Sequence, residues 1–303
     1  MLAFGLISLS ICAQTTVDLE EIKKLASDYQ LLVDQLGLNA NTLEALRNKA
    51  LLHAFYLDEK STSIEILNQV ISTPRVDRQL QAKCKLDLGD IYILTGEPWE
   101  STLLYSQVEK ANKDTPIGYQ AKLKNAKLNY YKGDFELAKG HLDILKLATS
   151  REISNDAIAL GVLIEDNTAL DTSDFVMKEF ASIELLLFQN QFESAKEQLL
   201  SMLEKYPGHS LTDEVWWQLA QVARQMGDFH EAVSYLERIV AEYDYDILSD
   251  DAYFLMATIN EDQLQDSEKA MELYQEFLKI HPGSKFVAEA RKRFRALRGD
   301  FIN

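Results

Sequence analysis

The chain has 303 residues, of which 47% are hydrophobic and 26% are charged, an ordinary balance for a soluble chain that buries a large core. Twelve glycines and five prolines are about half the usual share, which argues against a turn-rich β-sandwich, a collagen-like chain or a long disordered linker. The net charge of −17 would be repelled by a nucleic-acid backbone or an anionic membrane surface. Composition therefore predicts a helical, acidic protein.

The first sixteen residues have the features of a secretory signal peptide. Residues 2–11 are an apolar stretch of signal-core length, too short to span a bilayer. Cleavage after Ala13 would leave Gln14 as the mature start. Two alternatives stay open: these residues end an upstream helix at a misassigned start, or residues 9–12 act as a lipobox and Cys12 is acylated, although Ile11 stands where a small residue belongs.

Only one other cysteine, Cys84, is present, so no disulfide framework is available. We expect Cys84 to be a buried small apolar residue.

A segment of eleven residues recurs from Lys205, Glu242 and Ile280, at spacings of 37 and 38 residues. In each copy a Pro or Asp follows an aromatic residue or His and ends one helix. Thr212 and Ser249, each followed by acidic residues, are then predicted as N-caps of the next helix.

A second pattern confirms the repeat. A small residue and, four positions later, a large one recur with steps of 38, 37, 57, 37 and 38 residues. Short polar breaks precede several of these pairs, so each unit is predicted to be helix, turn, helix. The small positions should lie at helix crossings with almost no exposed surface; we assign this role to Gly89, Ala138, Ala195, Ala220, Ala232 and Ala270. The recurring pairs are Ser63/Leu67, Ser101/Tyr105, Ala138/Leu142, Ala195/Leu199, Ala232/Leu236 and Ala270/Tyr274.

Over residues 41–283 these patterns resemble the tetratricopeptide repeat, W-x2-L-G-x2-Y followed by A-x3-F and P. Lys85-x2-Leu88-Gly89-x2-Tyr92 and Trp216-x2-Leu219-Ala220 fit its first part. The period here is longer than the usual ~34 residues. The resemblance implies an all-α, right-handed α–α superhelix (solenoid) of about six helix pairs.

The expected organisation follows the repeat. We predict a signal peptide (1–16), an N-terminal helix (17–40), repeats 1–3 (41–150), an inserted helix and loop (151–173), repeats 4–6 (174–283) and a basic C-terminal capping helix (284–303).

The long period and the YPGxS-like linker are similar to envelope members of the superfamily, such as BamD-like outer-membrane assembly lipoproteins and periplasmic repeat proteins of Bacteroidetes type. This resemblance implies a periplasmic or cell-envelope scaffold, associated with the outer membrane through its partners. If the N-terminus is not a signal peptide, the same fold implies a cytoplasmic regulatory adaptor.

No catalytic motif is present: HExxH, CxxC, GxSxG and phosphate-binding glycine patterns are all missing. The acidic residues from Asp244 to Asp251 lack the central Gly and distal Glu of a calcium loop and are better interpreted as helix-capping acids. We therefore expect no enzyme activity, no cofactor, no metal, no small-molecule substrate and no nucleic acid, and a protein or peptide partner instead.

Aromatic residues on the first helices are the candidate binding residues. Trp216 and Trp217 are adjacent and so cannot face the same side of a helix. If Trp216 packs between helices, Trp217 faces an inner, concave wall, with Arg224 two turns further on. An extended or helical peptide would suit such a wall; the alternative is that these aromatics are partly covered by the inserted segment 151–173. The candidates are Tyr130, Phe180, Trp217, Arg224 and Phe254.

The C-terminal segment is basic, with Phe286, Ala290, Phe294 and Leu297 at near-helical spacing. This predicts an amphipathic capping helix with a basic outer face, as terminal repeats require. A docking site for an acidic partner is the alternative.

Overall fold

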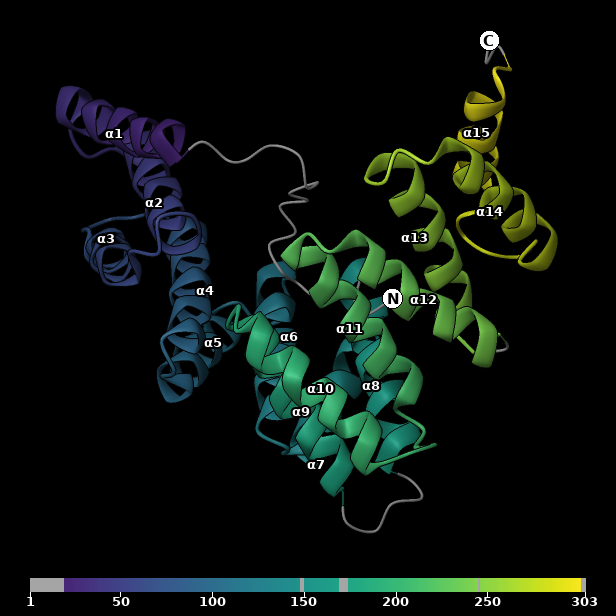
Figure 1. Ribbon diagram of the computed structural model, residues 1–303. Coiled ribbons are helices and arrows are strands. Elements are labelled where there is room, and N and C mark those ends of the chain that lie inside the picture. Colours follow the sequence, from purple (N-terminus) through teal and green to yellow (C-terminus); the bar gives the residue numbers. More distant parts are fainter. Residues whose placement is uncertain (1–18, 148–149, 169–173, 245, 301–303) are drawn as a thin grey trace. The chain divides into compact units, whose positions relative to one another are not determined.

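The computed structural model describes residues 19–147, 150–168, 174–244 and 246–300, and within these ranges the chain folds into fifteen α-helices and no strand (Figure 1). The proposed signal peptide and Cys12 lie outside the described residues. The helices confirm the all-α fold class.

Twelve of the helices form six successive pairs, each a first helix, a short turn and a second helix. The pairs are α2 (Ala40–Phe55) with α3 (Lys60–Ser72), α4 (Arg78–Leu94) with α5 (Pro98–Ala111), α6 (Pro116–Tyr131) with α7 (Phe135–Leu145), α9 (Phe175–Phe188) with α10 (Phe192–Lys205), α11 (Thr212–Met226) with α12 (Phe229–Glu242), and α13 (Leu248–Asp262) with α14 (Ser267–Ile280).

Three helices stand outside the pairs: α1 (Leu19–Leu36), α8 (Arg151–Thr168) and α15 (Val287–Arg298). The described residues divide into two compact units, the first ending at Glu165 and the second beginning at Asp166, so the boundary lies inside α8. In the first unit α2 to α7 pack in sequence, and in the second α9 to α15 do so.

The small and large positions identified from the sequence form the core of every pair. All twelve side chains of the six recurring pairs are 0% exposed. Gly89 shows why the first helix must be small where it faces the second: a Cβ there would lie 2.3 Å from the Tyr105 ring. Ser101 lies at the same crossing and donates a hydrogen bond to the Gly89 carbonyl, 2.7 Å away. The expected burial is thus confirmed at Gly89 and at the five alanines.

The turn inside each pair contains one residue with a left-handed backbone, which ends the first helix as a C-terminal glycine does. Only three of the six are glycine, for which positive φ carries no steric cost. The six residues are Asp58, Gly96, Gly133, Asn190, Gly227 and Gln265.

The prediction that Thr212 and Ser249 are N-caps is wrong. α11 begins at Thr212 itself, and the Thr212 hydroxyl donates to the carbonyl of His209, 2.6 Å away. Ser249 lies inside α13. The Thr212 hydroxyl therefore donates back to the turn instead of accepting from the helix N–H groups, whereas the buried Ser249 hydroxyl has no hydrogen-bond partner among the described residues. The acidic residues do lie in the first turns, where they face the positive end of the helix dipole.

Candidate partner-binding surface

Ion pairs join each first helix of the first unit to the next one. Arg47 on α2 donates from Nε to the Asp87 carboxylate on α4, 2.5 Å away, and from Nη2 at 3.2 Å. Lys124 on α6 contacts both oxygens of Asp90 on α4 at 2.8 Å. These contacts occupy the flank where neighbouring first helices meet, so they hold the helices together and leave other positions to face a partner.

Burial sets the protonation of this network. Desolvation raises the pKa of Asp87, and the hydrogen bond and positive charge of Arg47 oppose that rise. Tyr105, fully buried beneath Asp90, donates its hydroxyl to that carboxylate at 2.6 Å. Its pKa lies well above the usual value because of burial and then the Asp90 charge. Cys84 lies on α4 with Asp87 and is buried, as expected. Burial raises the pKa of its thiol to about 12, so Cys84 is not a reactive thiolate.

Similar contacts recur in the second unit. Gln218 on α11 donates to Glu184 on α9 at 2.8 Å, with both side chains buried. Arg293 on α15 reaches Glu261 and Asp262 on α13 at 2.8 and 3.0 Å. Sequence reasoning missed these contacts. The sequence does contain charged residues on first helices about one repeat apart. The earlier helix supplies the cation in the Arg47–Asp87 pair but the carboxylate in the Asp90–Lys124 pair, so no fixed charge pattern repeats.

Two of the five candidate binding residues are enclosed by protein. Tyr130 on α6 is 1% exposed, with its ring centroid 5.9 Å from that of Phe135. Phe180 on α9 is 0% exposed. This corrects the expectation that these two rings line an open wall. Tyr130 belongs to the first compact unit. The other four candidates, Phe180, Trp217, Arg224 and Phe254, belong to the second.

Phe254 on α13 is half-buried and stacks on Phe286, with ring centroids 4.4 Å apart and planes inclined by 3°. The Phe254 ring also contacts the rings of Tyr274 and Phe277 on α14. Its side chain therefore fills the space between α13 and the helices that follow, a cover that the sequence analysis did not propose.

Trp216 and Trp217 make different contacts, because adjacent residues of a helix cannot face the same side. Trp216 stacks on Tyr235 of α12, with centroids 5.7 Å apart. Trp217 is half-buried and packs against the core formed by α11 to α15. Arg224, also half-buried, donates to the side chain of Gln221 at 2.7 Å. Trp217, Gln221 and Arg224 follow one face of α11 by their spacing, and each keeps part of its surface in solvent.

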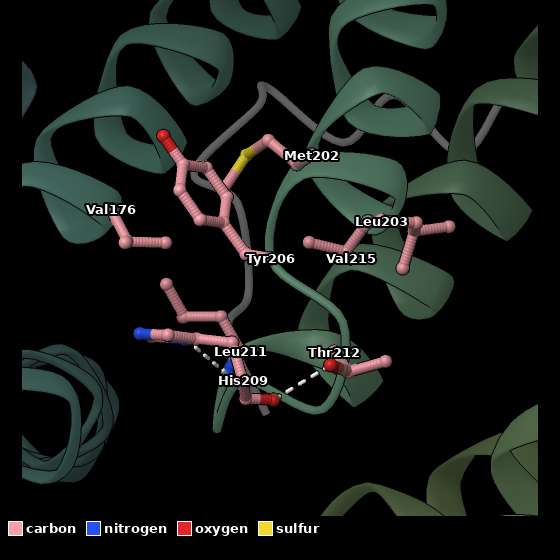
Figure 2. Close-up of a pocket in the computed structure, with 8 residues that line it drawn as sticks. All are labelled: Val176, Met202, Leu203, Tyr206, His209, Leu211, Thr212 and Val215. Atoms are coloured by element: carbon pink, nitrogen blue, oxygen red, sulfur yellow. Dashed lines mark hydrogen bonds between the residues drawn. The ribbon is translucent and has the colours of Figure 1, made fainter.

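The linker between α10 and α11 forms a small pocket (Figure 2). The Tyr206 ring forms one wall, and its hydroxyl donates to Glu179 on α9 at 2.8 Å. The Leu211 N–H donates to His209 Nδ1 at 3.1 Å, which fixes the turn at the other side (Figure 2). The empty space of this pocket is about 190 Å³, part of which is open solvent. The lining residues are Val176, Met202, Leu203, Tyr206, His209, Leu211, Thr212 and Val215.

Two acids share the first turn of α11. Desolvation raises the pKa of Glu214 well above its usual value, and the nearby Asp213 carboxyl raises it further. Burial also raises the pKa of Asp213. A carboxyl beside a carboxylate holds a proton more tightly because both cannot ionise at low cost.

In the described part of the chain, no group of three His, Cys, Asp or Glu side chains is arranged to hold a metal ion. Across the same residues, each helix is too short or too polar to cross a membrane.

Comparison with known proteins identifies the repeat in the second unit. The tetratricopeptide repeat family model matches residues 180–247 and again residues 218–285, together about a third of the chain. The two matches are offset by 38 residues, the period read from the sequence. Residues 180–285 are therefore similar to tetratricopeptide repeats. No relative was found among curated proteins.

Solved structures with helical repeats are also similar. A tetratricopeptide repeat protein from Parabacteroides merdae is 10% identical, with 92% of this chain and 98% of that chain covered and a TM-score of 0.36. A signal-transduction ATPase with a tetratricopeptide repeat sensor, from Pyrococcus horikoshii, is 16% identical over 93% of this chain and 43% of that one, with a TM-score of 0.37. Yeast Tom70 is 14% identical, with 86% and 66% covered and a TM-score of 0.31.

Proposed function

We propose that the chain is a non-catalytic scaffold that binds a partner polypeptide along the first helices of its helix pairs. The match of residues 180–285 to the tetratricopeptide repeat carries this proposal, because proteins with this repeat generally mediate protein–protein interactions. Stacked helix pairs expose an extended surface made of first-helix side chains, and such arrays use it for binding.

The contact residues we propose are Trp217 and Arg224 on α11, with Gln221 between them. Their spacing supports this choice, since it puts all three on one face, and each is partly exposed. Trp and Arg are also the residue types that most often dominate interface energies. Tyr130 and Phe180 are left out because they are buried, and Phe254 because it stacks on Phe286.

Site-specific photo-crosslinking tests this surface. A benzoylphenylalanine in place of Gln221 should capture a discrete polypeptide in the native host. The matched control places the same group at Arg238, which lies on the second helix α12 with 61% of its side chain exposed. A product from position 221 alone supports the proposal. Equal products from both positions, or a product only from position 238, would place the binding surface on the second helices.

We further propose that this scaffold works in the bacterial cell envelope, in the periplasm, with partners at the outer membrane. The apolar residues 2–11 and the small residue Ala13 support an exported protein, as does the resemblance of the long repeat period to envelope proteins. Cell fractionation with N-terminal sequencing tests it: the periplasmic form should begin at Gln14. A full-length protein in the cytoplasm would support the alternative, a cytoplasmic adaptor.

A further inference from the structure

The helix α1 lies in the place of a second helix at the start of the array. Each interior second helix with described neighbours packs between two first helices: α3 between α2 and α4, α5 between α4 and α6, and α12 between α11 and α13. Within the described residues, α1 has one substantial neighbour, α2 (Figure 1). The flank of α1 beside this contact therefore corresponds to the side on which α3, α5 and α12 each meet another helix.

That flank carries an apolar stripe with the spacing of a helix–helix seam. Ile22, Leu25, Tyr29, Leu32 and Leu36 follow one another by steps of three and four residues, which is the heptad pattern of packed helices. Leu25, Leu32 and Leu36 are 41%, 37% and 61% exposed, while Ile22 and Tyr29 are half-buried. We call these five residues the α1 seam. One edge of the seam is thus covered by α2, and the other edge is in solvent.

The charge beside the exposed edge is negative. Glu21, Lys24 and Asp28 each precede a seam residue by one position and all three are exposed, so two acidic groups stand against one basic group along this edge. In packed helices these flanking positions select a partner by charge. A second copy of this chain, which has a net charge of −17, would bring its own acidic flank against them. A helix with Lys or Arg beside its apolar face complements them instead.

The other end of the array shows what a capped end looks like in the same chain. In α15 Ala290 is buried, and Phe294, Leu297 and the preceding Phe286 are half-buried against the core. Throughout α15 every fully exposed large side chain is polar, and Arg291, Lys292 and Arg295 lie on its outer face. A polar outer face is what a terminal repeat needs for solubility. On α1, by contrast, the apolar side chains of Leu25, Leu32 and Leu36 are exposed.

We propose that the α1 seam binds an amphipathic α-helix of a partner polypeptide whose apolar face is flanked by basic residues. The bound helix lies antiparallel to α1, as the two helices of each internal pair lie to one another, and covers Leu25, Leu32 and Leu36. This surface is separate from the α11 face in the proposed function and rests on no part of it.

A designed peptide tests the proposal. The probe is a fluorescent peptide of about 18 residues with leucines at heptad spacing and Lys and Arg beside them, and its anisotropy is measured against the full chain. The variant Leu25→Gln/Leu32→Gln/Leu36→Gln should weaken binding at least tenfold. Leu31→Gln is the matched control, because Leu31 is 52% exposed on α1 but lies outside the seam, and it should bind as the wild type does. Circular dichroism and melting verify that both variants fold.

A second probe, with Glu in place of the Lys and Arg residues, isolates the charge. It should bind at least tenfold more weakly than the basic peptide, and Glu21→Lys/Asp28→Lys should reverse that order. Equal binding of the basic peptide to the wild type and the triple variant would overturn the proposal. So would a wild-type dimer in light scattering that the triple variant converts to monomer, since the occupant would then be a second copy.

Discussion

The turn inside each helix pair requires a left-handed residue, and the chain meets this requirement with three glycines and three other residues. An L-residue with a side chain pays a steric cost of about 1–2 kcal/mol in this conformation, which glycine avoids. The equivalent positions Gly227 and Gln265, with φ of 82° and 55°, allow this cost to be measured in both directions within one unit.

Gly227→Ala should lower the free energy of unfolding by about 1 kcal/mol, because backbone strain outweighs the entropy that alanine removes from the unfolded chain. A Cβ at this position would meet no heavy atom within 4 Å, so the loss reports backbone strain alone. Gln265→Gly should raise stability by up to about 1 kcal/mol for the same reason. Urea titrations of both variants test this; a loss of stability in Gln265→Gly would show that its hydrogen bond to the Asp262 carbonyl matters more than φ.

Between elements, the buried ion pairs decide how firmly neighbouring first helices are held. A buried pair contributes little net stability compared with apolar packing, yet removing one partner is costly because the other charge stays buried. Arg47 and Asp87, with side chains 19% and 10% exposed, suit this test.

Arg47→Met should destabilise the first unit by about 3–5 kcal/mol at neutral pH. Desolvation already raises the pKa of Asp87, and loss of the cation raises it further. A group whose folded pKa is raised loses stability as the pH rises through that pKa. The penalty should therefore shrink on acidification, once the Asp87 carboxyl is protonated. Thermal melts from acidic to neutral pH check this. The double variant Arg47→Met/Asp87→Leu should recover most of the loss, and failure to do so would assign the effect to packing of the arginine stem.

The sequence predicted the elements better than the direction of individual side chains. The small–large pattern is set by how closely two helices must cross, so Ala232 and Tyr105 could be placed from spacing alone. The same spacing makes Phe180, Trp217 and Phe254 equivalent, but a period does not say which neighbour the shared position faces. Trp216 and Trp217 allow two rotations of α11, and the choice depends on Tyr235, which only the packed pair brings into contact. The Arg47–Asp87 pair joins positions about one repeat apart, but the next pair has its carboxylate at Asp90 and its cation at Lys124, so the period does not say which helix carries which charge.

At the scale of the whole chain, stability in a repeat array is approximately a sum over units and their nearest-neighbour interfaces. A defect in one pair should therefore spread to the adjoining pairs and fade beyond them. The division into two compact units inside α8 strengthens this expectation, because α2 to α5 belong to the first unit and α12 to the second.

Ala232→Leu should show this containment. Ala232 is 0% exposed where α12 crosses α11, so added methylenes overpack the crossing at a cost of about 1–3 kcal/mol. Hydrogen exchange read by mass spectrometry should quicken in α11 to α14 and stay unchanged in α2 to α5. Ala241→Leu, exposed on the same helix, is the control and should exchange as the wild type does. If α2 to α5 also exchange faster in Ala232→Leu, the chain unfolds as one cooperative body, and the nearest-neighbour description does not apply to it.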